Sequence, residues 1–167
     1  MNTPMKRGAL IGCGFFAENH LHAWSGMQDA EIIALCDIDE TRLEATAIRF
    51  GIEKRYRCAQ EMMADESLDF VDIATTVGSH RVLVEICAPH VATVICQKPF
   101  AETIADAQAM VDHCLALGTN LIIHENFRWQ RAFQQMKEMV DAGKIGTPHF
   151  ARFSFRHGYD NYVNQPY

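Results

Sequence analysis

The residues best suited to chemistry form a glycine-containing turn at residues 12–17, directly after the apolar run 9–11. Their pattern is G-x-G-x-x-A, in which Gly12 permits a tight turn that residues with a Cβ resist. Gly14 leaves room for a pyrophosphate near the backbone, and Ala17 lets a helix pack closely on a strand. The amides and positive dipole end of the next helix would face the phosphates. Such spacing also arises by chance, so it indicates a phosphate-binding turn only together with other features of the chain.

A carboxylate, Asp37, ends the apolar run 31–37 about 20 positions after this turn. A carboxylate at such a position can accept hydrogen bonds from both hydroxyls of an adenosine ribose, and it repels a 2′-phosphate. Asp37 therefore favours NAD over NADP as the ligand. Two alternatives stay open: Asp37 is a helix cap or a solvated charge, and the nearby Arg42 admits a 2′-phosphate.

Lys98 is the candidate for proton transfer. It stands in the segment Gln97-Lys98-Pro99, directly after the apolar run 91–96. At a ligand-binding edge, desolvation or a neighbouring cation can adapt a lysine to acid–base work. Pro99 fixes the chain direction after the lysine and allows a cis peptide bond. The alternative is a solvated loop charge, which is the commoner role of a loop lysine taken alone.

These candidates need a scaffold that brings strand ends together, and the alternation of apolar runs with helical patterns predicts one. Strands are expected at residues 9–11, 31–37, 55–57, 69–75, 91–96 and 121–123, and helices at 15–27, 40–50, 60–64, 82–88, 103–117 and 131–142. Asp39 or Thr41 would cap the second helix, and Ser79 the fourth. The pattern predicts an α/β fold with a doubly wound parallel sheet. Right-handed crossovers then place every strand-to-helix turn at one carboxyl edge, where ligands bind.

The end of the chain changes in character. Residues 148–156 alternate apolar with polar side chains, which predicts a half-exposed strand. We expect a dinucleotide-binding domain at residues 1–124 and the start of an α+β domain at 125–167, too short to enclose a second core. An unpaired strand and its apolar face would favour self-association through this region.

Composition excludes several classes of function. The 167 residues carry 15 basic and 21 acidic side chains, a net charge of −6, which argues against a nucleic-acid binder. No apolar run reaches the roughly 18 residues of a membrane span, and no signal peptide is evident, so we expect a cytoplasmic protein. The six cysteines form no C-x-x-C pair and are interpreted as buried free thiols. The histidines show no metal-ligand spacing, so no metal site is expected.

The ordered set of motifs resembles the Gfo/Idh/MocA family of NAD(P)-dependent oxidoreductases. The set comprises the turn 12–17, Asp37, Thr75 with His80, the segment 97–100 and the segment 124–128. The resemblance spans residues 6 to about 158. It implies a Rossmann domain, a second α/β domain on a large open sheet, and hydride transfer between nicotinamide C4 and a carbinol carbon of a sugar, inositol or related polyol.

The same resemblance assigns roles to particular residues. It implies that Lys98 orients substrate and assists proton transfer, with Asn126 and Arg128 entering the active site. The expected cofactor-binding set is Gly12, Gly14, Phe15, Phe16, Ala17, Asp37, Arg42, Thr75, His80, Gln97, Lys98 and Asn126. Gln97 replaces the glutamate usual in the family, which removes a charge beside Lys98, and Thr76 replaces a common proline. A helix cap or surface residue is the alternative for His80.

The resemblance also implies a longer protein, about twice this length, whose second domain supplies an aspartate and a histidine for proton transfer. No such segment occurs at residues 125–167. We therefore expect a fragment, or a chain that another chain completes. Alternatives are a module that binds NAD without catalysis, and a scaffold that binds no nucleotide. The expected partners are a small sugar or polyol and further copies of the chain, joined through the second-domain sheet.

Overall fold

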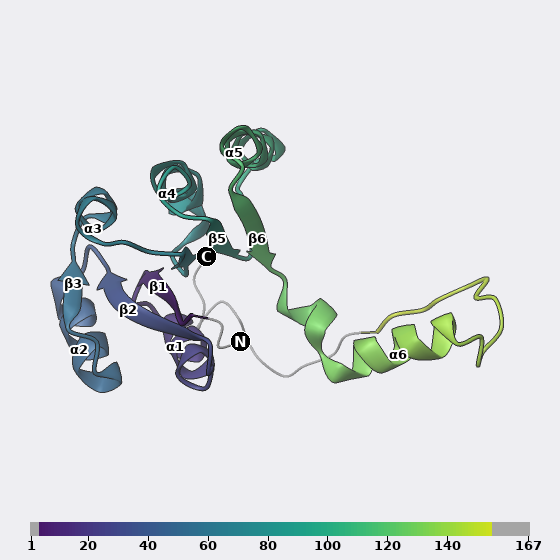
Figure 1. The fold of residues 1–167 in the computed structure, drawn as a ribbon. Helices are drawn as coiled ribbons and strands as arrows, with labels where there is room; N and C mark the ends of the chain where they lie inside the picture. Colours follow the sequence, from purple (N-terminus) through teal and green to yellow (C-terminus); the bar gives the residue numbers. More distant parts are fainter. Residues whose placement is uncertain (1–3, 155–167) are drawn as a thin grey trace. The chain divides into compact units, whose positions relative to one another are not determined.

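A computed structural model describes residues 4–154 of the chain. The chain divides into two compact units, Met1–His124 and Glu125–Tyr167. The first unit is a six-stranded parallel sheet in the order β3-β2-β1-β4-β5-β6 (Figure 1). Its strands are β1 (Lys6–Ile11), β2 (Ala30–Cys36), β3 (Lys54–Tyr56), β4 (Phe70–Ile73), β5 (Thr93–Gln97) and β6 (Asn120–His124). The doubly wound parallel α/β fold predicted from the sequence is confirmed.

Helices cover both faces of this sheet, α1 and α2 on one side and α3, α4 and α5 on the other (Figure 1). Their bounds are α1 (Ala17–Ser25), α2 (Glu40–Phe50), α3 (Ala59–Asp65), α4 (His80–Cys87) and α5 (Ile104–Leu117), with a 3₁₀ turn η1 (Val77–Ser79) before α4. Alternation along β1 explains the two layers: Ala9 and Ile11 join the core under α3–α5, whereas Leu10 packs with Leu21 of α1 and Leu43 of α2.

The register of the strands places their carboxyl ends level with one another. Ile11 pairs with Cys36 of β2 and with Ile73 of β4, and Ile73 pairs with Cys96 of β5. The residues that follow these strand ends therefore share one edge. The strand order also reverses beside β1, which is the topological switch point at which open α/β sheets bind ligands.

Helix boundaries follow local signals in most places. Asp39 caps α2 by accepting a hydrogen bond from the Arg42 amide, and α2 and α5 end at Gly51 and Gly118, as predicted. The expected side-chain cap at Ser79 is wrong. Its hydroxyl oxygen lies 2.8 Å from both Thr75 Oγ1 and the Thr76 carbonyl, so its single proton is shared there and it accepts no hydrogen bond from α4.

The second unit contains the 3₁₀ turn η2 (Asn126–Trp129) and helix α6 (Arg131–Asp141). The strand expected at 148–156 is wrong for its described part, because residues 148–154 form no strand. A strand is held by hydrogen bonds to a neighbour, and within residues 125–154 no element offers one. Residues 155 and 156 lie outside the described residues. The assignment of this unit to the start of an α+β domain stays a prediction.

Candidate functional site

The turn after β1 can be built only around glycine at its first position. Gly12 has φ 98°, and a Cβ there would lie 2.8 Å from Thr75 Cγ2 and 2.9 Å from the backbone of Ala74. The Gly12 amide donates to the Cys36 carbonyl at 2.7 Å. The turn is therefore fixed against the ends of both β2 and β4.

We expect Gly12→Ala to lower the free energy of unfolding by more than about 3 kcal/mol, because a strained φ adds to a clash with the Ala74 backbone. Urea denaturation measures the change. Gly51→Ala is the matched control: its φ is 68°, but nothing lies within 4 Å of its Cβ. We expect Gly51→Ala to cost only about 1–2 kcal/mol, from the left-handed backbone alone. Equal costs would contradict the packing argument for Gly12.

Gly14 presents an open face two residues later. Its φ is not in the left-handed region, and nothing lies within 4 Å of a Cβ placed there. Ala17 begins α1 and is 1% exposed, so its small side chain lets the helix start against the sheet. The backbone at Gly14 and the start of α1 thus offer a surface that a phosphate group can approach.

Asp37 is joined to this turn by its side chain. Its Oδ2 accepts a hydrogen bond from the Cys13 amide at 2.6 Å, and its Oδ1 accepts one from the Asp39 amide at 2.7 Å. The residue is 9% exposed. Because each carboxylate oxygen can accept more than one hydrogen bond, lone pairs remain for a ligand. The structure therefore brings Asp37 to the glycine turn, as the sequence predicted.

Arg42 and Cys13, which lie close to Asp37 in the sequence or the fold, each interact with other groups of the protein. Arg42 Nε donates to Asp39 Oδ2 at 3.0 Å and forms an exposed ion pair with it. Burial, with the charge of Asp37 as the second cause, raises the pKa of the Cys13 thiol to about 11. Helix N-termini tend to lower thiol pKa values, but here burial dominates. Cys13 is a neutral, small residue of the turn.

Thr75 and His80 connect the end of β4 to the loop after β5. The His80 ring is 1% exposed, with Nε2 3.1 Å from the Thr75 carbonyl and Nδ1 3.1 Å from the Phe100 carbonyl. Thr75 Oγ1 accepts a hydrogen bond from Ser79 at 2.8 Å. His80 therefore holds two loops of the sheet edge together. The cofactor contact predicted for it stays a prediction.

Lys98 lies at the same edge, close to the turn. The Lys98–Pro99 peptide bond is cis, the geometry that the sequence allowed. Lys98 Nζ lies 5.6 Å from the centre of the Phe16 ring, within cation–π range. Phe15, next to it in the turn, is 76% exposed. The sequence therefore correctly predicted that Lys98 and the glycine turn meet.

A buried polar chain behind Lys98 was not predicted. Gln97 Oε1 accepts a hydrogen bond from the Lys98 amide at 2.7 Å, and Gln97 Nε2 lies 2.8 Å from His20 Nε2. His20 Nδ1 lies 2.8 Å from Asp72 Oδ2, which also accepts from Trp24 Nε1 at 2.7 Å. One signal was available, since Asp72 is a charged residue inside an apolar strand.

Asn126 and Arg128 belong to η2 in the second unit. Within that unit, the Arg128 guanidinium lies 5.1 Å from the centre of the Trp129 ring. Their predicted entry into an active site stays a prediction.

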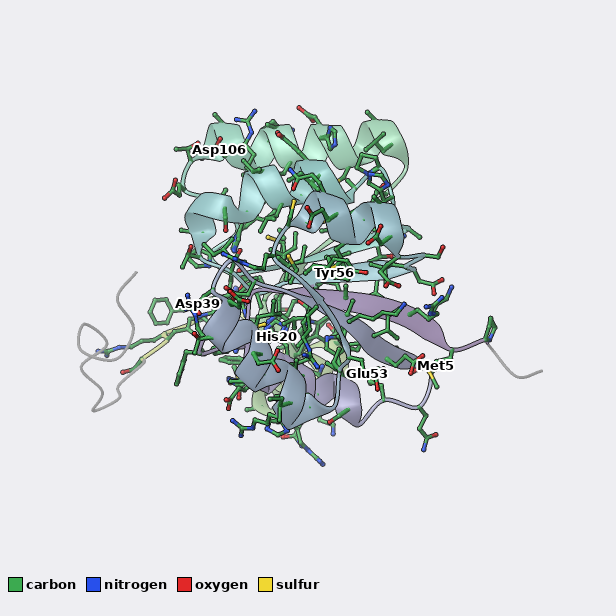
Figure 2. All side chains as sticks on the ribbon, turned by 90° about the vertical axis from the view of Figure 1, so that its left-hand side faces the viewer. Met5, His20, Asp39, Glu53, Tyr56 and Asp106 are labelled. Atoms are coloured by element: carbon green, nitrogen blue, oxygen red, sulfur yellow. The ribbon has the colours of Figure 1, made fainter. Side chains whose placement is uncertain are left out.

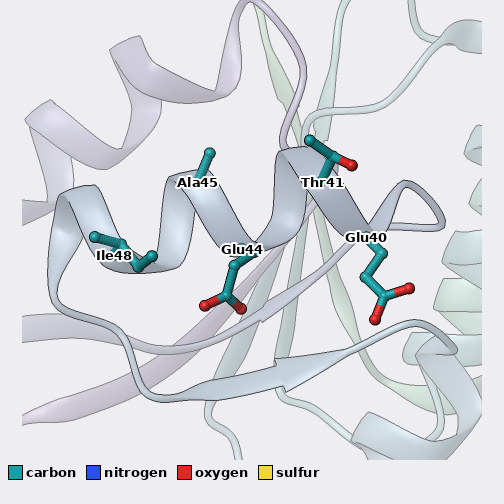
Figure 3. A pocket seen from close by; sticks show the side chains of 5 residues that line it. All are labelled: Glu40, Thr41, Glu44, Ala45 and Ile48. Carbon is teal, nitrogen blue, oxygen red and sulfur yellow. The ribbon is translucent and has the colours of Figure 1, made fainter.

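A surface hollow also occurs on α2 (Figure 3). It is lined by Glu40, Thr41, Glu44, Ala45 and Ile48. None of these residues belongs to the predicted site, and the lining carries two carboxylates on an exposed helix face. It therefore offers no chemistry for a phosphate ligand. Among residues 4–154, no group of His, Cys, Asp and Glu could hold a metal ion, and no helix could span a membrane.

A parallel sheet in this order, with a glycine turn after β1 and a carboxylate after β2, defines a dinucleotide-binding Rossmann domain. Residues 6–127 match the Gfo/Idh/MocA family model, described as an oxidoreductase family with an NAD-binding Rossmann fold. The chain belongs to this family, and the resemblance noted from its motifs is confirmed.

Named relatives and a solved structure agree with this membership. The chain is 56% identical to D-apiose dehydrogenase of Paraburkholderia graminis over 99% of its own length and 44% of that protein. It is 31% identical to myo-inositol 2-dehydrogenase of Thermotoga maritima, over 90% of this chain and 45% of that protein. An oxidoreductase from Agrobacterium radiobacter, solved in complex with NAD⁺, L-tartaric acid and magnesium, superposes with a TM-score of 0.93 at 53% identity and covers 97% of this chain and 47% of that one. The chain thus spans less than half the length of these proteins.

Proposed function

We propose that this chain binds NAD at the carboxyl edge of its sheet and supplies the cofactor-binding part of a dehydrogenase that acts on a sugar or polyol. The observation that carries the proposal is the hydrogen bond between the Cys13 amide and Asp37, beside the open face of Gly14. It supports the proposal because an adenosine ribose and a diphosphate bind beside a carboxylate and an approachable backbone of this kind in such folds. The names of the relatives support D-apiose as the first substrate to test.

Each residue then has a defined task. Backbone amides at the start of α1 hold the diphosphate, and Asp37 accepts hydrogen bonds from the ribose hydroxyls. A bound NAD would supply the acceptor for the hydride of the carbinol carbon. Lys98 Nζ takes the hydroxyl proton as the hydride leaves, so that a carbonyl forms with charge and atoms in balance. Two contacts hold Lys98 at the sheet edge: His80 with the Phe100 carbonyl, and the Lys98 amide with Gln97 Oε1.

Cofactor choice tests the role of Asp37. We expect NADH to bind to the chain at least about tenfold more tightly than NADPH, because the Asp37 carboxylate faces the ribose and repels a 2′-phosphate. Fluorescence titration with each dinucleotide measures both affinities. In Asp37→Asn, which keeps an acceptor oxygen but no charge, the preference should fall towards equality. Equal affinities in the unchanged protein would contradict this role, and no binding of either would refute the proposed function.

Catalysis is tested in a chimera in which this chain replaces the matching part of Paraburkholderia graminis D-apiose dehydrogenase. The expected result is NADH formation from NAD with D-apiose, followed by its absorbance. A chimera that folds and binds NADH, yet oxidises neither D-apiose nor a panel of sugars and inositols, would favour the non-catalytic module.

Two further expectations belong to the proposal. All six cysteines are free, which suits a reducing compartment and supports a cytoplasmic location. Oligomers formed through the second unit remain part of the proposal. The exposed Phe150 and Phe153 side chains support an apolar contact there, and light scattering at high protein concentration measures the state.

A further inference from the structure

Three buried polar side chains from three different elements form one hydrogen-bonded chain inside the first unit. His20 of α1 is 5% exposed, Asp72 of β4 is 1% exposed and Gln97 of β5 is 5% exposed. Figure 2 shows His20 in the interior, whereas Asp39 and Asp106 lie towards the periphery. Buried polar groups of this kind are costly unless each is paired, so the direction of every hydrogen bond is constrained.

The Lys98 amide fixes the first direction. A backbone N–H can only donate, so the Gln97 atom that meets it at 2.7 Å is the carbonyl oxygen Oε1. The amide nitrogen of Gln97 therefore faces His20 Nε2 at 2.8 Å and donates to it. A ring nitrogen that accepts carries no proton, so the proton of a neutral His20 lies on Nδ1 and is donated to Asp72 at 2.8 Å.

Asp72 anchors the far end of this chain. Its Oδ2 accepts from both His20 and Trp24, while Oδ1 is buried without a hydrogen-bond partner among residues 4–154. A buried carboxylate with so few donors depends strongly on each of them. Asp72 thus holds the His20 ring in one orientation and one tautomer, as a carboxylate hydrogen-bonded to one ring nitrogen does for functional histidines.

His20 also connects the two parts of the proposed site. It lies on α1, the helix that begins directly after the glycine turn, and it touches Gln97, which precedes Lys98. The ring of Phe16 meets the His20 ring edge-on at 5.7 Å between centres, and Lys98 Nζ lies over Phe16. The His20 side chain therefore links α1, the helix that would face the phosphates, to the loop that carries Lys98.

We propose that His20 is a positioning residue, fixed as its Nδ1–H tautomer by Asp72, which sets the orientation of the Gln97 amide and so the backbone position of Lys98. The importance of that position rests on the proposed function, in which Lys98 transfers a proton. The hydrogen-bond geometry does not rest on it. A merely structural His20 would stabilise the fold without selecting the orientation of Gln97.

Two substitutions of His20 separate these possibilities in the 167-residue chain. His20→Asn keeps an amide nitrogen near the place of Nδ1, so it can donate to Asp72 but cannot reach Gln97. His20→Gln keeps an amide oxygen near the place of Nε2, so it can accept from Gln97 but loses Asp72. Each variant retains one buried hydrogen bond and loses the other.

The readout is hydrogen exchange of the Lys98 amide, measured by NMR without cofactor. We expect exchange to accelerate about fivefold to tenfold in His20→Asn, beyond any change common to the core amides, because the freed Gln97 no longer accepts from Lys98. In His20→Gln, protection should return to within about twofold of the unchanged protein. Thr119→Val is the matched control. It removes a buried hydrogen bond of 2.7 Å to the Ala88 carbonyl, outside this chain, and should leave Lys98 unchanged relative to the core.

The tautomer is measured directly in the unchanged protein from the ¹⁵N shifts of the His20 ring. Protonated Nδ1 and bare Nε2 are expected. The reverse tautomer would overturn the proposal, and so would equal Lys98 exchange in the two His20 variants. If either variant fails to fold, the ¹⁵N shifts of the unchanged protein still test the tautomer, and the exchange of the Lys98 amide in the remaining variant tests the orientation of Gln97. If the unchanged protein did not bind NADH, the proposed function would be refuted, but the conclusion about the tautomer of His20 and the orientation of Gln97 would still hold.

Discussion

Replacing Lys98 by methionine should lower kcat of the chimera by about 100-fold to 10,000-fold, the range typical of losing a general acid–base. Methionine keeps a long apolar stem over Phe16 but has no group that accepts a proton. The affinity for NADH should fall far less than kcat, because the diphosphate and adenosine-ribose contacts lie elsewhere, although Lys98 itself belongs to the expected cofactor-binding set. Stopped-flow measurement of NADH formation and fluorescence titration give the two quantities separately.

Lys98→Arg is the matched control for this experiment. Its guanidinium keeps the positive charge and the contact with an aromatic ring, but it does not release its proton in proteins. We expect kcat to fall nearly as far as in Lys98→Met. If Lys98→Arg retained most of the activity, Lys98 would act through its charge alone and the proton-transfer role would be wrong.

Gly14→Val should abolish NADH binding, with a loss of at least about 100-fold in affinity, while the protein stays as stable as before. No atom lies within 4 Å of a Cβ at Gly14, and its φ lies outside the left-handed region. Valine therefore meets no obstacle in the fold and restricts the unfolded chain slightly. Its branched side chain instead fills the space that a diphosphate needs at the backbone.

The measurement pairs a dinucleotide titration with urea denaturation of the same variant. Gly12→Ala provides the contrast, because that substitution should destabilise the fold itself. If Gly14→Val bound NADH normally, the diphosphate would not lie at this turn. If Gly14→Val unfolded, the open space beside Gly14 would be wrong.

Structural features that depend on a few neighbouring residues were predictable from the sequence. The glycine turn, the apolar runs and the helix-ending glycines each reflect local backbone preferences, and register then aligned the strand ends without further information. Asp37 and Lys98 came to the same sheet edge for that reason. The sequence allowed the cis bond before Pro99 without predicting it, and Asp39 was one of two candidate caps for α2.

What could not be predicted depends on packing between distant segments. His20, Asp72 and Gln97 are far apart in the sequence, and nothing local shows that their side chains meet. Ser79 was expected to cap α4, but Thr75 and Thr76 compete for its hydroxyl. The alternation at 148–156 predicted a strand, yet pairing needs a partner that a single stretch cannot provide.

In the proposed function, a nicotinamide dinucleotide lies across the strand ends with its diphosphate at the first turn. Two-dimensional ¹H–¹⁵N NMR of the chain, recorded while NADH is added, tests it most directly. We expect the largest saturable shifts on the amides of residues 13–17 and of Asp37 and Asp39. Shifts centred on the α2 hollow at Glu44 and Ile48, or no saturable shifts at all, would contradict it.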